Sequence, residues 1–63
     1  MYRLIHKEEK CEPVEKIFMS LDHILDFYST YPASFGPYMR DLLAGNKSEI
    51  PYSDYITLEI EKI

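Results

Sequence analysis

The sequence has few of the features that stabilise or specialise small proteins. Its 63 residues include one cysteine, two glycines and no tryptophan. The single cysteine, Cys11, excludes an internal disulfide, and no CxxC or HxxxH pair provides a structural zinc site. No apolar run approaches the roughly 20 residues that a membrane-spanning helix needs, and the opening MYRLIHKEEK lacks the apolar core of a signal peptide. We therefore expect a cytoplasmic protein, in the host cytoplasm if the chain is viral, with no membrane association.

Basic residues are also scarce. Seven lysines and arginines stand against eleven aspartates and glutamates, which gives a net charge of −4. A chain this acidic is repelled by a phosphate backbone, so we expect no direct nucleic-acid binding. Binding of nucleic acid through aromatic residues on a sheet is a weaker hypothesis, because few basic residues flank them. Basic protein surfaces are the more favourable partners.

Apolar and aromatic residues, in contrast, are abundant. Hydrophobic residues make up 46% of the chain, and six tyrosines and three phenylalanines supply nine aromatic rings. This composition predicts a folded chain and excludes intrinsic disorder. Residues 1–63 are enough for a single domain, but one that removes only about 60% of its unfolded surface from water. Such a domain needs an unusually good core or a partner subunit.

The clearest periodic stretch lies between Ser20 and Pro32. At about 100° per residue its apolar side chains fall in one arc, which predicts an amphipathic helix over 21–31. That arc contains Leu21, Ile24, Leu25, Phe27, Tyr28 and Tyr31. Ser20 is a suitable N-cap, and Pro32 disfavours helical backbone in the residue before it. We expect this helix to supply the centre of the core.

Three strands and a second helix complete the predicted order. Residues 2–7, 14–19 and 54–63 have the alternating pattern of strands, and 37–44 is a short helix that begins with proline and ends before Gly45. We read 46–53 as a connecting loop. The predicted fold is a small α+β two-layer sandwich of order β-β-α-α-β, with an antiparallel-rich three-stranded sheet covered on one face by two helices.

Apolar residues on both sides of the predicted sheet favour self-association. In 14–19, Val14 and Phe18 lie on one face and Ile17 on the other, and Ile5 points away from Leu4. A chain this short has too few residues to cover both faces itself. We therefore expect a homodimer.

Catalytic and metal-binding residues are hard to identify. His6, Cys11 and His23 are the only soft metal ligands, and their spacing matches no ligand pattern. Asp22, His23 and Asp26 occupy the polar side of the predicted helix, which has to be polar in any case. Since the chain also has little room for a substrate pocket, we predict no enzyme activity, no catalytic residue, no metal and no cofactor.

Acidic and tyrosine side chains make up the predicted binding surface. Its members lie in the first turn and along the last strand: Glu8, Glu9, Glu12, Tyr52, Asp54, Tyr55, Glu59 and Glu61. Carboxylates about 6–7 Å apart on one side of a strand are spaced like successive phosphates. Tyrosine is frequent in interfaces, although a small protein also leaves some aromatic rings exposed without any partner. Acidic groups are likewise often no more than a solvated surface.

In size, charge and secondary structure the chain resembles small acidic phage proteins that occupy the DNA-binding sites of host enzymes. The resemblance implies a protein-binding module, encoded by a phage or mobile element, that inhibits or modulates a host protein through a basic nucleic-acid-binding groove. The alternative is a homodimeric structural or assembly protein with no inhibitory target.

Overall fold

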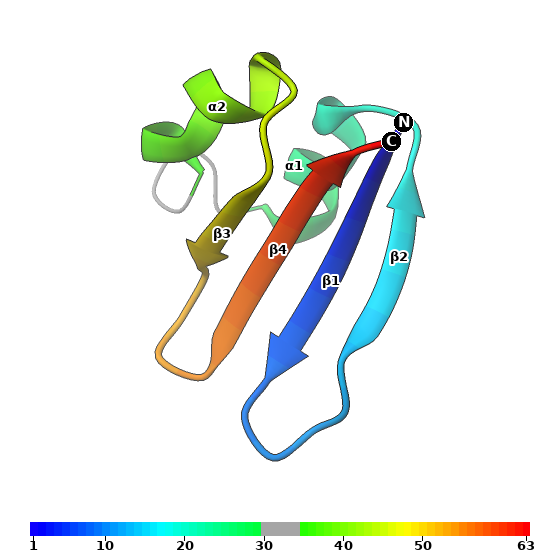
Figure 1. Ribbon diagram of the computed structural model, residues 1–63. Helices are drawn as coiled ribbons and strands as arrows, with labels where there is room; N and C mark the ends of the chain where they lie inside the picture. Colours follow the sequence, from blue (N-terminus) through cyan, green and yellow to red (C-terminus); the bar gives the residue numbers. More distant parts are fainter. Residues whose placement is uncertain (30–34) are drawn as a thin grey trace.

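The computed structural model describes residues 1–29 and 35–63 and contains one antiparallel sheet with helices on one side. The strands are β1 (Tyr2–Glu8), β2 (Val14–Phe18), β3 (Ser48–Pro51) and β4 (Ile56–Lys62), in the spatial order β2-β1-β4-β3. The helices are α1 (Leu21–Tyr28), the 3-10 turn η1 (Gly36–Tyr38) and α2 (Met39–Leu43). Figure 1 shows the β1–β2 and β3–β4 turns at one end of the sheet and both termini at the other.

The α+β class is confirmed, but the predicted three-stranded sheet and its order are wrong. β3 forms within 46–53, which we had assigned to a loop. Its side chains alternate, with Ser48 and Ile50 buried and Glu49 and Pro51 exposed. Pro51 is tolerated because β3 is an edge strand, so its missing N–H removes no bond from the centre of the sheet.

α1 begins where the sequence predicts and ends earlier. The His23 N–H donates to Ser20 Oγ at 3.4 Å, which confirms the N-cap. The helix stops at Tyr28 because Ser29 adopts a left-handed conformation with φ of 55° and its N–H donates to the Leu25 carbonyl. The Ser29 hydroxyl also donates to the backbone of Asp26, a local bond that competes with further helix. Tyr31 and Pro32 lie outside the described residues.

The second helical segment starts as a 3-10 turn at Gly36 and becomes α-helical at Met39. Gly45 follows with φ of 82°, the left-handed conformation expected of a residue that ends a helix. Leu42 is buried, whereas Leu43 is exposed. Adjacent residues of an α-helix point about 100° apart, so Leu43 turns away from the core when Leu42 packs into it.

The core lies between the helices and one face of the sheet. Its buried side chains are Leu4, Leu21, Ile24, Tyr28, Phe35, Leu42, Ile50, Leu58 and Ile60. Leu21, Ile24 and Tyr28 of α1 are buried as predicted and Leu25 is partly buried, but Phe27 remains exposed beside β2. There its ring packs edge-on against Phe18, and the Lys16 ammonium lies 4.2 Å from its centroid. Phe35 is fully buried although no periodic pattern around it predicted this.

The remaining strands agree with the sequence to within two residues at each end. β1 and β2 pair in the register Leu4↔Lys16, and β1 and β4 pair in the register Leu4↔Ile60. Residues 54 and 55 form a turn and not the start of the last strand, because β4 begins at Ile56. The face opposite the helices carries Ile5, Ile17 and a set of charged side chains, and within 1–29 and 35–63 no helix or strand packs over it.

Candidate functional site

Two turns meet at the end of the sheet farthest from the termini. Asp54 and Tyr55 form the tip of the β3–β4 hairpin, between reciprocal backbone bonds of Ser53 and Ile56. The Glu9 N–H donates to the Tyr55 carbonyl at 2.8 Å and so joins the β1–β2 turn to this tip. We call residues 8–12 and 53–56 the hairpin end.

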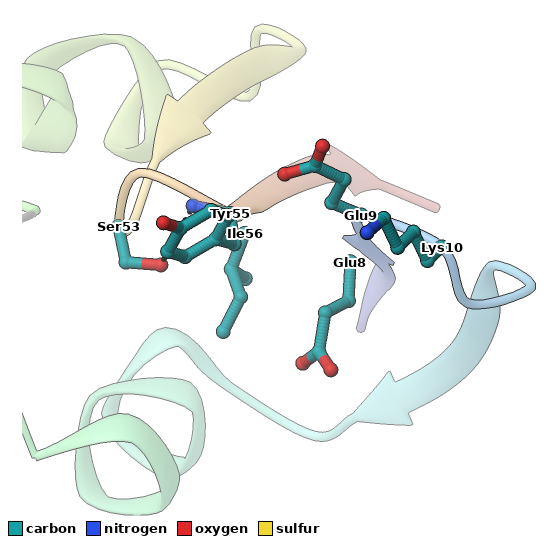
Figure 2. Close-up of a pocket in the computed structure, with 6 residues that line it drawn as sticks. All are labelled: Glu8, Glu9, Lys10, Ser53, Tyr55 and Ile56. Carbon is teal, nitrogen blue, oxygen red and sulfur yellow. Dashed lines mark hydrogen bonds between the residues drawn. The ribbon is translucent and has the colours of Figure 1, made fainter.

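An open depression of about 520 Å³ lies between these turns. It is lined by Glu8, Glu9, Lys10, Ser53, Tyr55 and Ile56. Figure 2 shows Tyr55 and Ile56 on one side and the three charged residues on the other. Tyr55 retains 66% of its surface exposed, whereas Ile56 packs partly against the core. The depression therefore combines an exposed aromatic ring, an apolar floor and two carboxylates.

Glu8 is held in position by neighbours on β1 and in the turn. His6 Nε2 lies 3.3 Å from Glu8 Oε1, and Cys11 Sγ donates to Oε2 at 3.6 Å. The same contact with Glu8 raises the pKa of the Cys11 thiol, which keeps the sulfur protonated. His6 Nδ1 lies 3.0 Å from the Tyr28 hydroxyl, whose burial raises the pKa of Tyr28 to about 12. A chain of polar contacts thus connects the core to the rim of the depression.

Other hairpin-end carboxylates have no ionic partner. Among the described residues no lysine, arginine or histidine nitrogen lies within 4 Å of Glu9, Glu12 or Asp54. Glu12 lines a neighbouring depression of about 300 Å³ together with His6, Glu8 and Cys11. The hairpin end holds four acids and one base, so it carries −3 of the net charge of −4.

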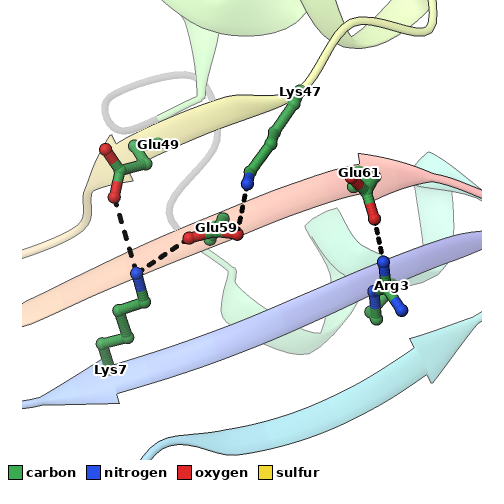
Figure 3. Close-up of polar contacts among 6 residues, drawn as sticks. All are labelled: Arg3, Lys7, Lys47, Glu49, Glu59 and Glu61. Carbon is green, nitrogen blue, oxygen red and sulfur yellow. Dashed lines mark hydrogen bonds and ion pairs between the residues drawn. The ribbon is translucent and has the colours of Figure 1, made fainter.

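Glu59 and Glu61 lie elsewhere, on the sheet face opposite the helices. Glu59 is bridged by Lys7 and Lys47, each at 2.8 Å, and Arg3 pairs with Glu61 (Figure 3). These lysine contacts lower the pKa of Glu59 to about 2. The Glu59 side chain is only 16% exposed, so its carboxylate is held by these lysines and is not free at the surface.

The two predicted tyrosines also separate. The Tyr52 hydroxyl donates to the Tyr28 carbonyl at 2.8 Å, and the two rings pack edge-on with centroids 5.0 Å apart. Tyr52 is thus part of the edge of the core. Tyr55 has no such packing and stands at the surface.

The structure therefore divides the eight predicted residues into three places. Glu8, Glu9, Glu12, Asp54 and Tyr55 belong to the hairpin end, and Tyr52 lies at the edge of the core. Glu59 and Glu61 lie on the open sheet face, the nearer of them about 10 Å along β4 from Ile56. Sequence reasoning missed Ile56, Ser53 and Lys10 as members of the depression. A β1–β4 pairing, with Glu8 opposite Ile56, was the missing information.

The described parts of the chain are 1–29 and 35–63. They contain no cluster of three or more histidine, cysteine or acidic side chains arranged to hold a metal ion. None of their helices has the length and apolar composition required to cross a bilayer. Comparison of the whole chain with models of protein families, with curated proteins and with solved structures found no match.

Proposed function

We propose that this protein is a protein-binding module whose hairpin end docks on a basic surface of a larger protein. The observation that carries the proposal is the concentration of unpaired carboxylates beside Tyr55, in a chain whose other charges nearly balance. Exposed charge of one sign accelerates encounter with an oppositely charged surface. An aromatic side chain with two rotatable angles then supplies contact area at a low entropy cost.

Docking through the hairpin end is a different arrangement from a DNA mimic built along β4. Such a mimic would present Glu59 and Glu61 as free charges, whereas both are paired with bases of the same sheet. A basic groove on the partner remains the expected counterpart, but it would contact the turns and not the last strand. Inhibition or modulation of a host protein is the consequence we expect of such docking.

Affinity capture with matched charge reversals tests this function. We expect the parent to retain one stoichiometric partner at 0.1 M salt and to release it at 1 M, where the Debye length falls from about 10 Å to 3 Å. Glu9→Lys should lose the partner without a change in melting temperature. Asp26→Lys makes the same charge change on exposed α1 and serves as the control that keeps binding. Equal capture by both variants would reject the hairpin end as the docking surface.

A homodimeric assembly protein is the second candidate. Its support is the edge strand β2, where Val14 and Ile17 are about half exposed on opposite faces of the sheet. An unpaired strand edge with apolar side chains is a template for pairing with another chain. Sedimentation equilibrium at micromolar concentration should then give twice the chain mass.

Variants at exposed apolar positions sharpen that measurement. We expect Ile17→Lys to sediment as a monomer and Leu43→Lys, a change at an exposed residue of α2, to remain dimeric. A monomeric parent would remove this candidate and leave Ile17 as an ordinary exposed side chain.

A further inference from the structure

Two surface depressions of almost equal volume allow an internal comparison. The hairpin-end depression measures about 520 Å³, and one beside α1 measures about 510 Å³. The second is lined by Asp22, Leu25, Asp26 and Ser29. Both therefore offer two carboxylates, a hydroxyl and an aliphatic side chain. Only the hairpin-end depression adds an aromatic ring.

The aromatic ring changes the class of ligand that fits. Carboxylates alone attract any cation, but in water a single exposed ion pair contributes little to affinity. A ring face opposite the carboxylates also favours a planar, weakly hydrated cation that can stack on it. Figure 2 shows Tyr55 across the depression from Glu9 and Glu8, whose carboxylates point to opposite sides, and both Glu8 oxygens already contact His6 and Cys11. A guanidinium group has the required shape and charge, and its five N–H donors can bond carboxylates while its plane stacks.

The side chains of the depression are attached to a well-bonded backbone. The Tyr55 carbonyl accepts a hydrogen bond from the Glu9 N–H. The Tyr55 N–H donates to the Ser53 hydroxyl at 3.3 Å. Glu8 is fixed by His6 and Cys11. Lys10, the one base in the lining, forms no ion pair within 4 Å of Glu8 or Glu9. A ligand cation would thus find the carboxylates without displacing an ion pair to lysine.

We propose that the hairpin-end depression binds the guanidinium group of an arginine side chain on the partner protein. This inference rests on the proposed function and specifies the chemistry of its contact. The arginine stacks on Tyr55, its aliphatic stem lies over Ile56, and its N–H groups donate to Glu9, while Glu8 adds negative charge at the edge of the depression. The partner's basic surface is then recognised through at least one arginine, for which lysine is a poor replacement.

Titration with argininamide, followed by the backbone amide signals in nitrogen-15 NMR spectra, tests the site directly. We expect saturable shifts at Glu9, Tyr55 and Ile56 and weaker, non-saturating changes along α1. Citrullinamide has the same α-amino group and a side chain of the same shape without the side-chain charge, and should produce no saturable shift. Lysinamide carries the charge without the planar group and should bind several-fold more weakly.

Variants then assign the contacts. Tyr55→Ala should weaken argininamide binding about two- to fivefold, the amount that a cation–π contact contributes at an exposed site, while Tyr55→Phe should preserve it. Glu9→Gln should weaken binding, and Asp26→Asn, in the other depression, should not. Unchanged melting temperatures establish that all four variants are folded.

Three results would overturn the arginine site: equal shifts with citrullinamide, equal affinity for lysinamide, or undiminished binding by Tyr55→Ala. If any of these appears while partner capture still depends on Glu9, docking stands and only the arginine assignment fails. If argininamide binds as expected but no partner is captured, the site stands and the docking function fails.

Discussion

The open face of the sheet and the hairpin end use similar side chains in opposite ways. On the open face Glu59 and Glu61 are matched by Arg3 and Lys7 of β1 and by Lys47 just before β3. At the hairpin end Glu9 and its neighbours extend beyond the paired strands, where the turns supply a single base. Cross-strand register brings opposite charges together, and a turn imposes no such pairing.

This difference separates structural carboxylates from those available to a partner. An acid bridged by two lysines has its charge compensated before any ligand arrives. An acid that no base bridges, beside an exposed ring, keeps an uncompensated negative charge that a partner can bind. Sequence position alone does not distinguish the two, since both groups occur among β-forming residues near charged neighbours.

The largest expected loss of stability comes from truncating the core beneath the sheet. We expect Ile50→Ala to cost about 2–5 kcal/mol, because Ile50 is completely buried and its truncation leaves a cavity. Val14→Ala, at the half-exposed start of β2 beside the β1–β2 turn, should stay within about 1 kcal/mol. Urea unfolding measures both. Similar losses would mean that the start of β2, next to the hairpin end, contributes as much to stability as the middle of the sheet.

The next effect is a charge reversal in each region. Glu59→Lys places an ammonium beside Lys7 and Lys47 and removes both ion pairs, so we expect the melting temperature to fall by several degrees. Glu9→Lys has no ion pair to break and should leave the melting temperature unchanged. Thermal unfolding followed by circular dichroism compares them at one pH and salt concentration. A fall of equal size in Glu9→Lys would contradict the division into paired and unpaired acids.

Removing the hydroxyl from Tyr52 and from Tyr55 gives a smaller effect. Tyr52→Phe should cost about 0.5–1.5 kcal/mol because the Tyr28 carbonyl loses its donor. Tyr55→Phe removes a hydroxyl that makes no intramolecular bond among the described residues, and should be neutral. Denaturant midpoints distinguish the two outcomes. An equal cost at Tyr55 would place its ring inside the structural network.

The smallest expected effect is a change in acid sensitivity. The pKa of Glu59 is lowered from 4.5 to about 2, so its contribution is present above pH 4.5 and is lost as the pH falls toward 2. Glu59→Gln should therefore flatten the decline of melting temperature over this interval. Glu9→Gln should show the same decline of melting temperature as the parent. If Glu9→Gln flattened the decline and Glu59→Gln did not, Glu9 would be the paired acid and Glu59 the unpaired one.

The local periodicity of the sequence was sufficient to identify most of the elements. The alternation in β1, β2 and β4, the amphipathic pattern and N-cap of α1, and the glycine after α2 all reflect bonds within a few residues of each other. β3 was missed because four residues ending in proline carry too weak a pattern. It forms as an edge strand because β4 is present to pair with it.

The sequence by itself determined the α+β class, the apolar side of α1 and the excess of acidic charge. Only the tertiary structure decided which acids are neutralised and which tyrosine is free, because those properties depend on strands far apart in the chain. Lys7 meets Glu59 through the β1–β4 register, and Glu9 meets Tyr55 through the same pairing. The register between two strands cannot be read from any single stretch of the sequence. It follows from the joint burial of Leu4, Leu58 and Ile60 against the helices.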